Sequence, residues 1–375
     1  MEIISFFQRQ LQSKFDFMKF CMRDFVRDCS DVFSNIKDIA RINPFAHFIQ
    51  RKQHYEIKER IEGKTVVVTG CSSGIGKATA KELYKAGGRV IMACIDIAEA
   101  ERTAEEIREE IRVSHSSGKT GELVVRELDL TSLESIRSCA EEIKRTERKI
   151  HILINNAGIL PGSRRLTEDG FEHTYVTNYL GHFYLTCQLL PKILASTPAR
   201  IVNVSSKAYE YGRIHWNDLT LEEDFSPIVA YAQSKLALIL FTRELASRLK
   251  GTGVTAYSLH PGIAKGTDIT KAYDTTFISG LSMRLFFFLY GAFMKTPKEG
   301  AATSLFCALD GSLVDESGFI TSKYKQETRR RNPEFISPPV AILQVGNTVF
   351  HPLNPLKISK LDHQESIVPD AFKWR

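Results

Sequence analysis

Residues 65–77, TVVVTGCSSGIGK, decide the fold, because a run of valines breaks into glycine where a new pattern begins. Beyond this stretch, small and aliphatic residues recur at helical spacing from Ala78 to Ala86. A buried strand, a glycine turn and an immediate helix place unpaired backbone N–H groups at the helix N-terminus, and with the helix dipole these groups attract an anion. The stretch therefore predicts a strand, a phosphate-binding turn and a helix.

The three glycines of the turn have separate tasks in this interpretation. Gly70 allows a tight turn, Gly74 lets the backbone approach a pyrophosphate, and Gly76 allows close packing of helix on strand. Their spacing, three residues and then one, differs from the G-x-G-x-x-G pattern of many dinucleotide sites. An ordinary glycine-rich connection in an α/β protein fits the turn equally well, so the turn needs support from the rest of the chain.

Composition excludes several classes of protein. The 375 residues are 43% hydrophobic and 25% charged, which is usual for a globular protein, and the net charge of +6 is spread among acidic residues. Because the chain has no basic block interleaved with aromatic residues, we expect no nucleic-acid partner. The seven cysteines show no C-x-x-C spacing, which is typical of reduced thiols in an intracellular protein.

The chain divides into three predicted parts: a phenylalanine-rich helical extension at 1–62, a catalytic domain at 63–324 and a proline-rich C-terminal strap or tail at 325–375. In the middle part, apolar strand-like runs alternate with amphipathic helical segments, which predicts a doubly wound parallel sheet of the Rossmann type, covered on both faces. The expected strands are 65–70, 89–94, 123–130, 151–158, 200–206, 254–262 and 319–324. Ser132 is the expected N-cap of one helix between them.

The extension is not a signal peptide, because charged residues interrupt each of its apolar runs. Two interpretations stay open: an amphipathic helix that lies on a membrane, and a helix that packs on its own domain. The strap contains six of the thirteen prolines, which excludes a long closing helix.

Tyr231 and Lys235, four residues apart, would share one face of a helix. A free phenol has a pKa near 10, and a neighbouring ammonium group lowers it toward the range useful for proton transfer. On spacing alone, an ordinary surface helix with an exposed Lys and a half-buried Tyr is the better explanation of the pair.

Four features stand in the order that a known family uses: TGCSSGIG at 69–76, NNAG at 155–158, Ser206 at a strand end, and YAQSK at 231–235. Together they resemble the short-chain dehydrogenases/reductases, and the text of residues 60–322 looks closest to the retinol dehydrogenase-like branch. The resemblance implies hydride transfer between a nicotinamide dinucleotide and a lipophilic carbonyl or alcohol, such as a retinoid, steroid or lipid aldehyde.

The resemblance also implies roles for individual residues. Tyr231 is the expected acid/base, Lys235 its electrostatic modulator and Ser206 the donor to the substrate oxygen, while Asn178 helps to hold the lysine and a relay water. The implied cofactor-binding residues are Gly70, Ser72, Ser73, Gly74, Ile75, Gly76, Asp129, Leu130, Asn156, Ala157, Gly158, Tyr231, Lys235, Pro261 and Gly262. No metal is expected.

The chain departs from the family pattern at the end of the second strand and after the Pro-Gly turn. Where NAD-preferring relatives place an Asp, this chain has Cys94, and where NADP-preferring members of the branch place an Arg, it has Ile95. Asp96 is left either to reach the ribose or to open the next helix. The usual threonine after the Pro-Gly turn comes one place late, as Thr267. NAD or NADP therefore remains open, and the branch resemblance favours NADP.

Residues 277–294, FISGLSMRLFFFLYGAFM, are too apolar for a solvent-facing helix. They predict either a lid that contacts an apolar substrate and a membrane surface, or a core helix at a homodimer seam. With the extension, the lid favours a cytosol-facing membrane surface, of the endoplasmic reticulum or a lipid droplet, over soluble cytoplasm. A rival of another class is a catalytically weak scaffolding or cofactor-sensing module on the same fold.

Overall fold

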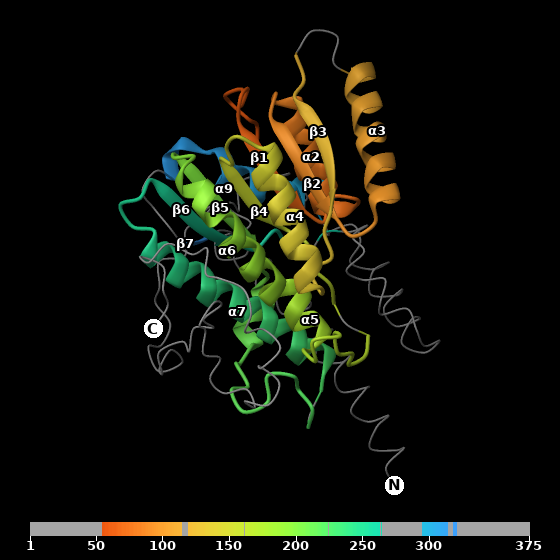
Figure 1. Ribbon diagram of the computed structural model, residues 1–375, viewed down its shortest axis with the longest axis vertical. Coiled ribbons are helices and arrows are strands. Elements are labelled where there is room, and N and C mark those ends of the chain that lie inside the picture. Colours follow the sequence, from red (N-terminus) through yellow and green to blue (C-terminus); the bar gives the residue numbers. More distant parts are fainter. Residues whose placement is uncertain are drawn as a thin grey trace, which may run out of the picture.

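The computed structural model of the protein describes residues 55–114, 119–160, 162–223, 225–262, 264, 295–313 and 318–320. Seven parallel strands form one sheet in the order β3-β2-β1-β4-β5-β6-β7 (Figure 1). The strands are β1 (Thr65–Thr69), β2 (Arg89–Cys94), β3 (Glu122–Glu127), β4 (Ile152–Asn155), β5 (Ala199–Val204), β6 (Val254–Leu259) and β7 (Gly318–Ile320). This arrangement confirms the predicted doubly wound fold.

Helices cover both faces of the sheet (Figure 1). The longer helices are α2 (Gly74–Lys85), α3 (Ile97–Ser114), α4 (Leu133–Thr146), α6 (Gly181–Leu194), α7 (Pro227–Arg248) and α9 (Pro297–Leu309). Short elements are α5 (His173–Tyr175), the π-helical η2 (Val176–Leu180), and the 3₁₀ helices η3 (Lys207–Tyr211) and η5 (Gly311–Leu313). One face packs against α4, α6 and α7, and the other against α2, α3 and α9.

The valine run shows why the strands read as continuous apolar segments. Val66 and Val68 lie in the core beneath α2 and α9, whereas Val67 lies in the opposite core with α4 and α6. All three side chains are fully buried. Because successive side chains of a strand point to opposite faces, a sheet covered on both sides needs apolar residues at every position.

The strand expected at 89–94 is confirmed as β2, whereas several others end earlier than the sequence indicated. The run expected at 123–130 is β3, which ends at Glu127, and the run expected at 151–158 is β4, which ends at Asn155. Likewise β5 ends at Val204 and β6 at Leu259. Apolar periodicity cannot mark the point where a backbone leaves the sheet, and the functional motifs occupy the turns just beyond.

Ser132 is the N-cap of α4, as expected, and its Oγ accepts a hydrogen bond of 3.2 Å from the N–H of Ser135. The last residues of the predicted helical extension, 55–62, are not helical in the structure, so this part of the prediction is wrong. Ile61 is buried, and its N–H donates to Ala86 O at 3.0 Å.

The remaining extension (1–54), the segment 277–294, Thr267 and the tail 325–375 lie outside the described residues, so their predictions stay untested. The same holds for residues 321–324 of the last expected strand. Among the residues that the structure does describe, no helix is both long and apolar enough to cross a membrane.

Candidate active site

The glycine-rich turn joins β1 to α2 at the carboxyl edge of the sheet, where the strand order changes direction. Gly70 has φ of 66°, in the region that favours glycine. A Cβ on Gly76 would lie 2.0 Å from Gly70 O, so only glycine allows α2 to pack this closely. No acidic residue occupies the first turn of α2, and its N-cap Ser73 makes no side-chain cap bond. The turn therefore suits a pyrophosphate at the helix N-terminus.

Thr69, the last residue of β1, connects this turn with the end of β4. Its Oγ1 accepts hydrogen bonds from the N–H groups of Asn156 (2.9 Å) and Ala157 (3.0 Å). Asn156 also donates through Nδ2 to Thr69 O and Gly70 O. The 156–158 segment and the glycine-rich turn thus form one hydrogen-bonded unit.

His182 on α6 is hydrogen-bonded to the same Thr69 hydroxyl and to the backbone of Asn178. Its Nε2 lies 2.9 Å from Thr69 Oγ1 and its Nδ1 lies 3.3 Å from Asn178 O. Burial lowers the pKa of His182 to about 3, so the ring is neutral. Because two N–H groups already donate to Thr69 Oγ1, its single proton points to Nε2, and the ring proton on Nδ1 is left to donate to Asn178 O.

Asn178 lies in η2, a π-helical stretch of the kind that often marks functional sites. Its Oδ1 accepts from Ile159 N at 2.8 Å, and its Nδ2 donates to Ile159 O and Ser234 Oγ, both at 3.0 Å. Ser234 Oγ in turn donates to Tyr231 O at 2.7 Å. Through Ser234, the Asn178 side chain is thus bonded to the backbone of α7, the helix that carries Tyr231 and Lys235.

Tyr231 and Lys235 share one face of α7, as their spacing predicted. Lys235 Nζ lies 5.6 Å from the centroid of the Tyr231 ring and donates to Val204 O, at the end of β5, at 2.9 Å. Burial lowers the pKa of Lys235 to about 8. The hydrogen bond to the Val204 carbonyl favours the charged form and opposes that shift. The ammonium group is thus held beside the phenol.

Ser206 follows β5 by two residues and is half-buried. It is the N-cap of η3, where its Oγ accepts from Ala208 N at 3.2 Å, and the hydroxyl proton is left for another acceptor. Its neighbour Ser205 donates from Oγ to Lys235 O at 2.9 Å. The end of β5 is thereby bonded to α7, the helix that carries Tyr231.

Pro261 and Gly262 follow β6, and Pro261 is buried. His260 before them accepts a hydrogen bond of 3.3 Å at Nδ1 from Lys207 N, the first residue of η3. Desolvation lowers the pKa of His260 to about 3. The end of β6 thus also meets the start of η3.

Of the residues predicted to contact the adenosine half of the cofactor, some are accessible and others are engaged in local structure. Ile95 follows β2 with 67% of its surface exposed, where a cofactor ribose would meet it. Asp96 takes the helix-opening role, because its Oδ1 accepts from Glu99 N at 2.8 Å. Asp129 lies two residues beyond β3, not at its end, and accepts from the N–H and hydroxyl of Thr131. Leu130 is buried in the core, so only its backbone is left for a cofactor.

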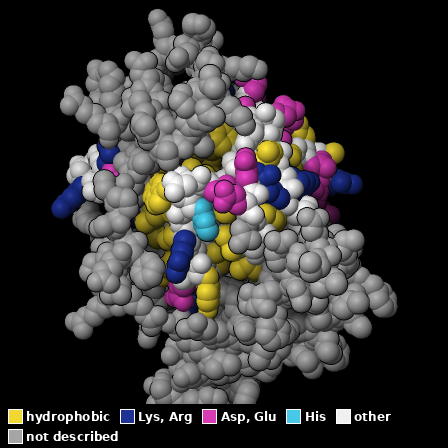
Figure 2. Space-filling model, turned by 90° about the horizontal axis from the view of Figure 1, so that it is seen from below, with side chains coloured by type: hydrophobic (Ala, Val, Ile, Leu, Met, Phe, Trp, Pro, Cys, Tyr) yellow, Lys and Arg dark blue, Asp and Glu magenta, His cyan; other side chains and the backbone are white. Residues whose placement is uncertain are grey.

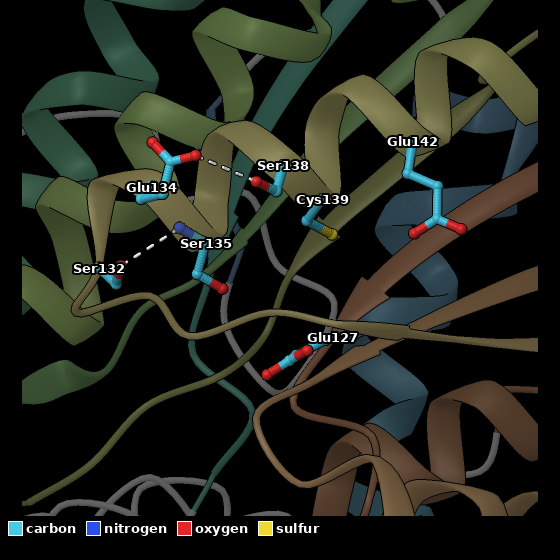
Figure 3. Close-up of a pocket in the computed structure, with 7 residues that line it drawn as sticks. All are labelled: Glu127, Ser132, Glu134, Ser135, Ser138, Cys139 and Glu142. Atoms are coloured by element: carbon cyan, nitrogen blue, oxygen red, sulfur yellow. Dashed lines mark hydrogen bonds between the residues drawn. The ribbon is translucent and has the colours of Figure 1, made fainter.

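A separate cavity of about 400 Å³ lies between the end of β3 and α4 (Figure 3). It is lined by Glu127, Ser132, Glu134, Ser135, Ser138, Cys139 and Glu142. None of the predicted site residues lines it. Its three glutamates would repel the phosphates of a dinucleotide, so we assign the cavity no part in the chemistry.

Sequence reasoning did not single out Thr69, His182 or Ser234. Thr69 lies inside the quoted motif TGCSSGIG, His182 follows Asn178 by four residues, and Ser234 lies between Tyr231 and Lys235. A buried polar residue within a motif of this kind is the signal that would have indicated them, because such a side chain needs a partner.

Comparisons with known proteins agree with this geometry. The family profile for short chain dehydrogenases matches residues 64–276. Retinol dehydrogenase 14 of Homo sapiens is 46% identical over 273 residues, which cover 71% of this chain and 80% of that protein. Retinol dehydrogenase 12 of Mus musculus is 45% identical over 276 residues, covering 73% and 83% respectively.

Two solved structures extend the comparison. An uncharacterized protein from Mycobacterium Paratuberculosis is 35% identical with a TM-score of 0.54, and the match covers 73% of this chain and 87% of that one. A protein from Beutenbergia cavernae, described as an NAD(P) dependent gluconate 5-dehydrogenase, was solved with bound NADP. It is 26% identical with a TM-score of 0.53, over 71% of this chain and 98% of that one.

Proposed function

Because this chain belongs to the short-chain dehydrogenase family, we propose that Tyr231, Lys235, Ser206 and Asn178 carry out reversible carbonyl reduction on a retinoid-like substrate. The chain is an NAD(P)-dependent oxidoreductase that acts on a lipophilic small molecule. The observation that carries the proposal is the position of Lys235 Nζ, held by Val204 O at a strand end and 5.6 Å from the Tyr231 ring.

The dinucleotide would bind along the carboxyl edge of the sheet. Its pyrophosphate fits the turn from Gly70 to Gly76, where a Cβ at the last glycine would clash with backbone. The 156–158 segment, held by Thr69, lies beside this turn and would support the ribose next to the nicotinamide. When bound, the dinucleotide supplies or accepts the hydride at its nicotinamide C4.

Tyr231 would move the proton that accompanies the hydride. In reduction its hydroxyl donates to the substrate oxygen as negative charge develops there, and in oxidation the phenolate takes the proton back. The Lys235 ammonium, in a buried site with few other charges to screen it, stabilises the phenolate. Ser206 would donate its hydroxyl proton to the same substrate oxygen and so fix the carbonyl orientation.

Several features support a retinoid-like substrate at a membrane surface. The relatives with 45–46% identity are named retinol dehydrogenases. The apolar segment 277–294 and the phenylalanine-rich extension would cover an apolar substrate and contact the membrane from which it diffuses. The described cysteines are all free thiols, consistent with a reducing, cytosol-facing location. A homodimer through 277–294 would be the alternative use of that segment.

The protein would discriminate only weakly between NAD and NADP, with a preference for NADP. Ile95 cannot bond a 2′-phosphate, yet no carboxylate at Cys94 repels it. The protein from Beutenbergia cavernae holds NADP.

The test uses the purified full chain. Nicotinamide fluorescence is titrated with NADPH and NADH, and NADPH oxidation is then followed with all-trans-retinal, a steroid ketone, a long-chain aldehyde and, as a hydrophilic control, glyceraldehyde. We expect micromolar binding of NADPH and turnover with lipophilic carbonyls only. Binding of neither dinucleotide at millimolar concentration would favour the scaffolding module, and turnover of glyceraldehyde alone would contradict the substrate class.

A further inference from the structure

The segment between Ser206 and Tyr231 is fixed by hydrogen bonds from a buried glutamine side chain and contains a residue with positive φ. It runs through η3 and residues 212–223 to the start of α7, in the lower part of Figure 1. Both of its ends are therefore close to the site.

Gln233 on α7 is the main attachment of this segment. Its side chain is 1% exposed, two residues after Tyr231 and two before Lys235. Its Oε1 accepts from His215 N at 2.8 Å, and its Nε2 donates to Leu219 O at 3.2 Å. One buried amide thus supplies both a donor and an acceptor to a loop backbone that has no strand or helix partner there.

Close packing on α7 supports the same shape. A Cβ on Gly212 would lie 2.5 Å from Ala232 O, so this part of the segment lies directly on the helix backbone. On the other side, Arg164 donates to Thr220 O at 2.9 Å. The segment is therefore held from two directions.

Leu221 shows that the shape is imposed. Its φ is 51°, in the left-handed region that a branched side chain disfavours, and its side chain is 2% exposed. The carboxylate of Asp218 accepts from the N–H groups of Glu222 and Glu223 around it. Strained backbone of this kind persists only where its surroundings over-determine it, and it is often found at ligand sites.

The segment also carries apolar side chains, and Ile214 and Leu219 pack against the hydrophobic core that contains α6 and α7. Tyr211 is 42% exposed, and Ile214 and Trp216 are half-buried. Figure 2 views the molecule from below, where hydrophobic side chains lie interspersed with charged residues and a histidine. An exposed aromatic ring such as Tyr211 suits a lipophilic substrate better than a polar one.

We propose that Gln233 is a positioning residue that holds residues 212–219 as one wall of the substrate site. It sets the affinity for the lipophilic carbonyl and leaves the chemistry to Ser206, Tyr231 and Lys235. This inference rests on the proposed function for its kinetic part, but the position of the wall itself can be measured without turnover.

The test replaces Gln233 by methionine, which keeps the length of the side chain and removes both hydrogen-bonding groups. With all-trans-retinal and NADPH, Gln233→Met should raise KM about tenfold, with kcat within about twofold of wild type and the Kd for NADPH unchanged. Gln188→Met, at a half-buried glutamine of α6, is the matched control and should change none of these constants.

A second readout does not depend on activity. Arg213 is exposed within the segment, so trypsin cleavage after it, followed by mass spectrometry, reports how firmly the wall is held. Cleavage should be about tenfold faster in Gln233→Met than in wild type or Gln188→Met. If Gln233→Met fails to bind NADPH, His215→Pro removes the same hydrogen bond from the loop side and should give the same KM and cleavage changes.

The outcomes separate the two proposals. Wild type without turnover would remove the proposed function, while the trypsin comparison would still test the wall. Unchanged KM and unchanged cleavage in an active variant would overturn the positioning role. A fall in kcat with unchanged KM would also overturn it, because Gln233 would then act on Tyr231 and not on the substrate wall.

Discussion

Thr69→Val removes one hydroxyl and keeps the shape of the side chain, so its effect isolates the hydrogen bonds that join the two cofactor turns. The Thr69 hydroxyl accepts from Asn156 N and Ala157 N and donates to His182 Nε2, each at 2.9–3.0 Å. Thr69 and His182 are fully buried, and the other two residues are half-buried.

The magnitude follows from the groups left unpaired. Each buried polar group that loses its partner costs about 1–3 kcal/mol, and the half-buried N–H groups belong at the low end because water can reach them. Two such N–H groups and one buried ring nitrogen give a loss of about 3 kcal/mol in the free energy of unfolding. The 156–158 segment would also loosen, so we expect the Kd for NADPH to rise about tenfold.

Urea unfolding followed by circular dichroism, and fluorescence titration with NADPH, measure the two effects. Thr79→Val is the matched control, because Thr79 is equally buried but its hydroxyl only donates to Ile75 O within α2. It should cost less than about 1 kcal/mol. If Thr69→Val costs no more than Thr79→Val and leaves the Kd unchanged, the hydroxyl does not hold the cofactor turns.

Two further predictions concern the ends of the site. Ile95→Arg should tighten NADPH about tenfold and leave NADH nearly unchanged, because a guanidinium group at this exposed position can pair with the 2′-phosphate. Val113→Arg, at another exposed apolar residue, is the control, and an unchanged Kd in Ile95→Arg would mean that position 95 does not face the ribose. Burial lowers the pKa of Lys235 from 10.5 to about 8. Between these two pH values the unfolded chain binds more protons than the folded chain, so folding becomes more favourable as pH rises. The whole shift corresponds to a cost of about 3 kcal/mol for burying the charged lysine at pH 7. The stability of Lys235→Met relative to wild type should therefore fall by about 3 kcal/mol between pH 7 and pH 10.5, as urea unfolding at both pH values would measure, and a constant difference would show that Lys235 is not desolvated.

The sequence predicted correctly those features that follow from strand or helix periodicity or from a glycine at a close contact. The valines of β1 are apolar at every position because both faces of the sheet are covered, and such runs alternating with helical segments predict a parallel sheet. Gly76 was assigned to close packing of α2, and a Cβ at this position would lie only 2.0 Å from Gly70 O. The helical spacing likewise placed Tyr231 and Lys235 on one face.

The hydrogen bonds between distant parts of the chain that complete the site leave no periodic pattern in the sequence. Thr69 meets His182 across 113 residues, and Asn178 meets Ser234 across 56. The strand expected at 123–130 included Asp129, yet β3 ends two residues before it. Long-range hydrogen bonds depend on where turns bring side chains together, and composition of a segment does not encode that position.

The account depends most on Tyr231 as the proton donor, and single-turnover kinetics tests that role. The full chain is saturated with NADPH, mixed with all-trans-retinal, and the decay of NADPH absorbance is followed for wild type, Tyr231→Phe and Tyr55→Phe. Tyr55 bonds Asp310, whose carbonyl accepts from Arg200 at the start of β5, so this control lies at the opposite edge of the sheet. Loss of a general acid typically costs a factor of 10²–10⁴. We predict that Tyr231→Phe slows the decay about 100-fold or more with an unchanged Kd for NADPH, whereas decay at the wild-type rate in Tyr231→Phe would contradict the mechanism.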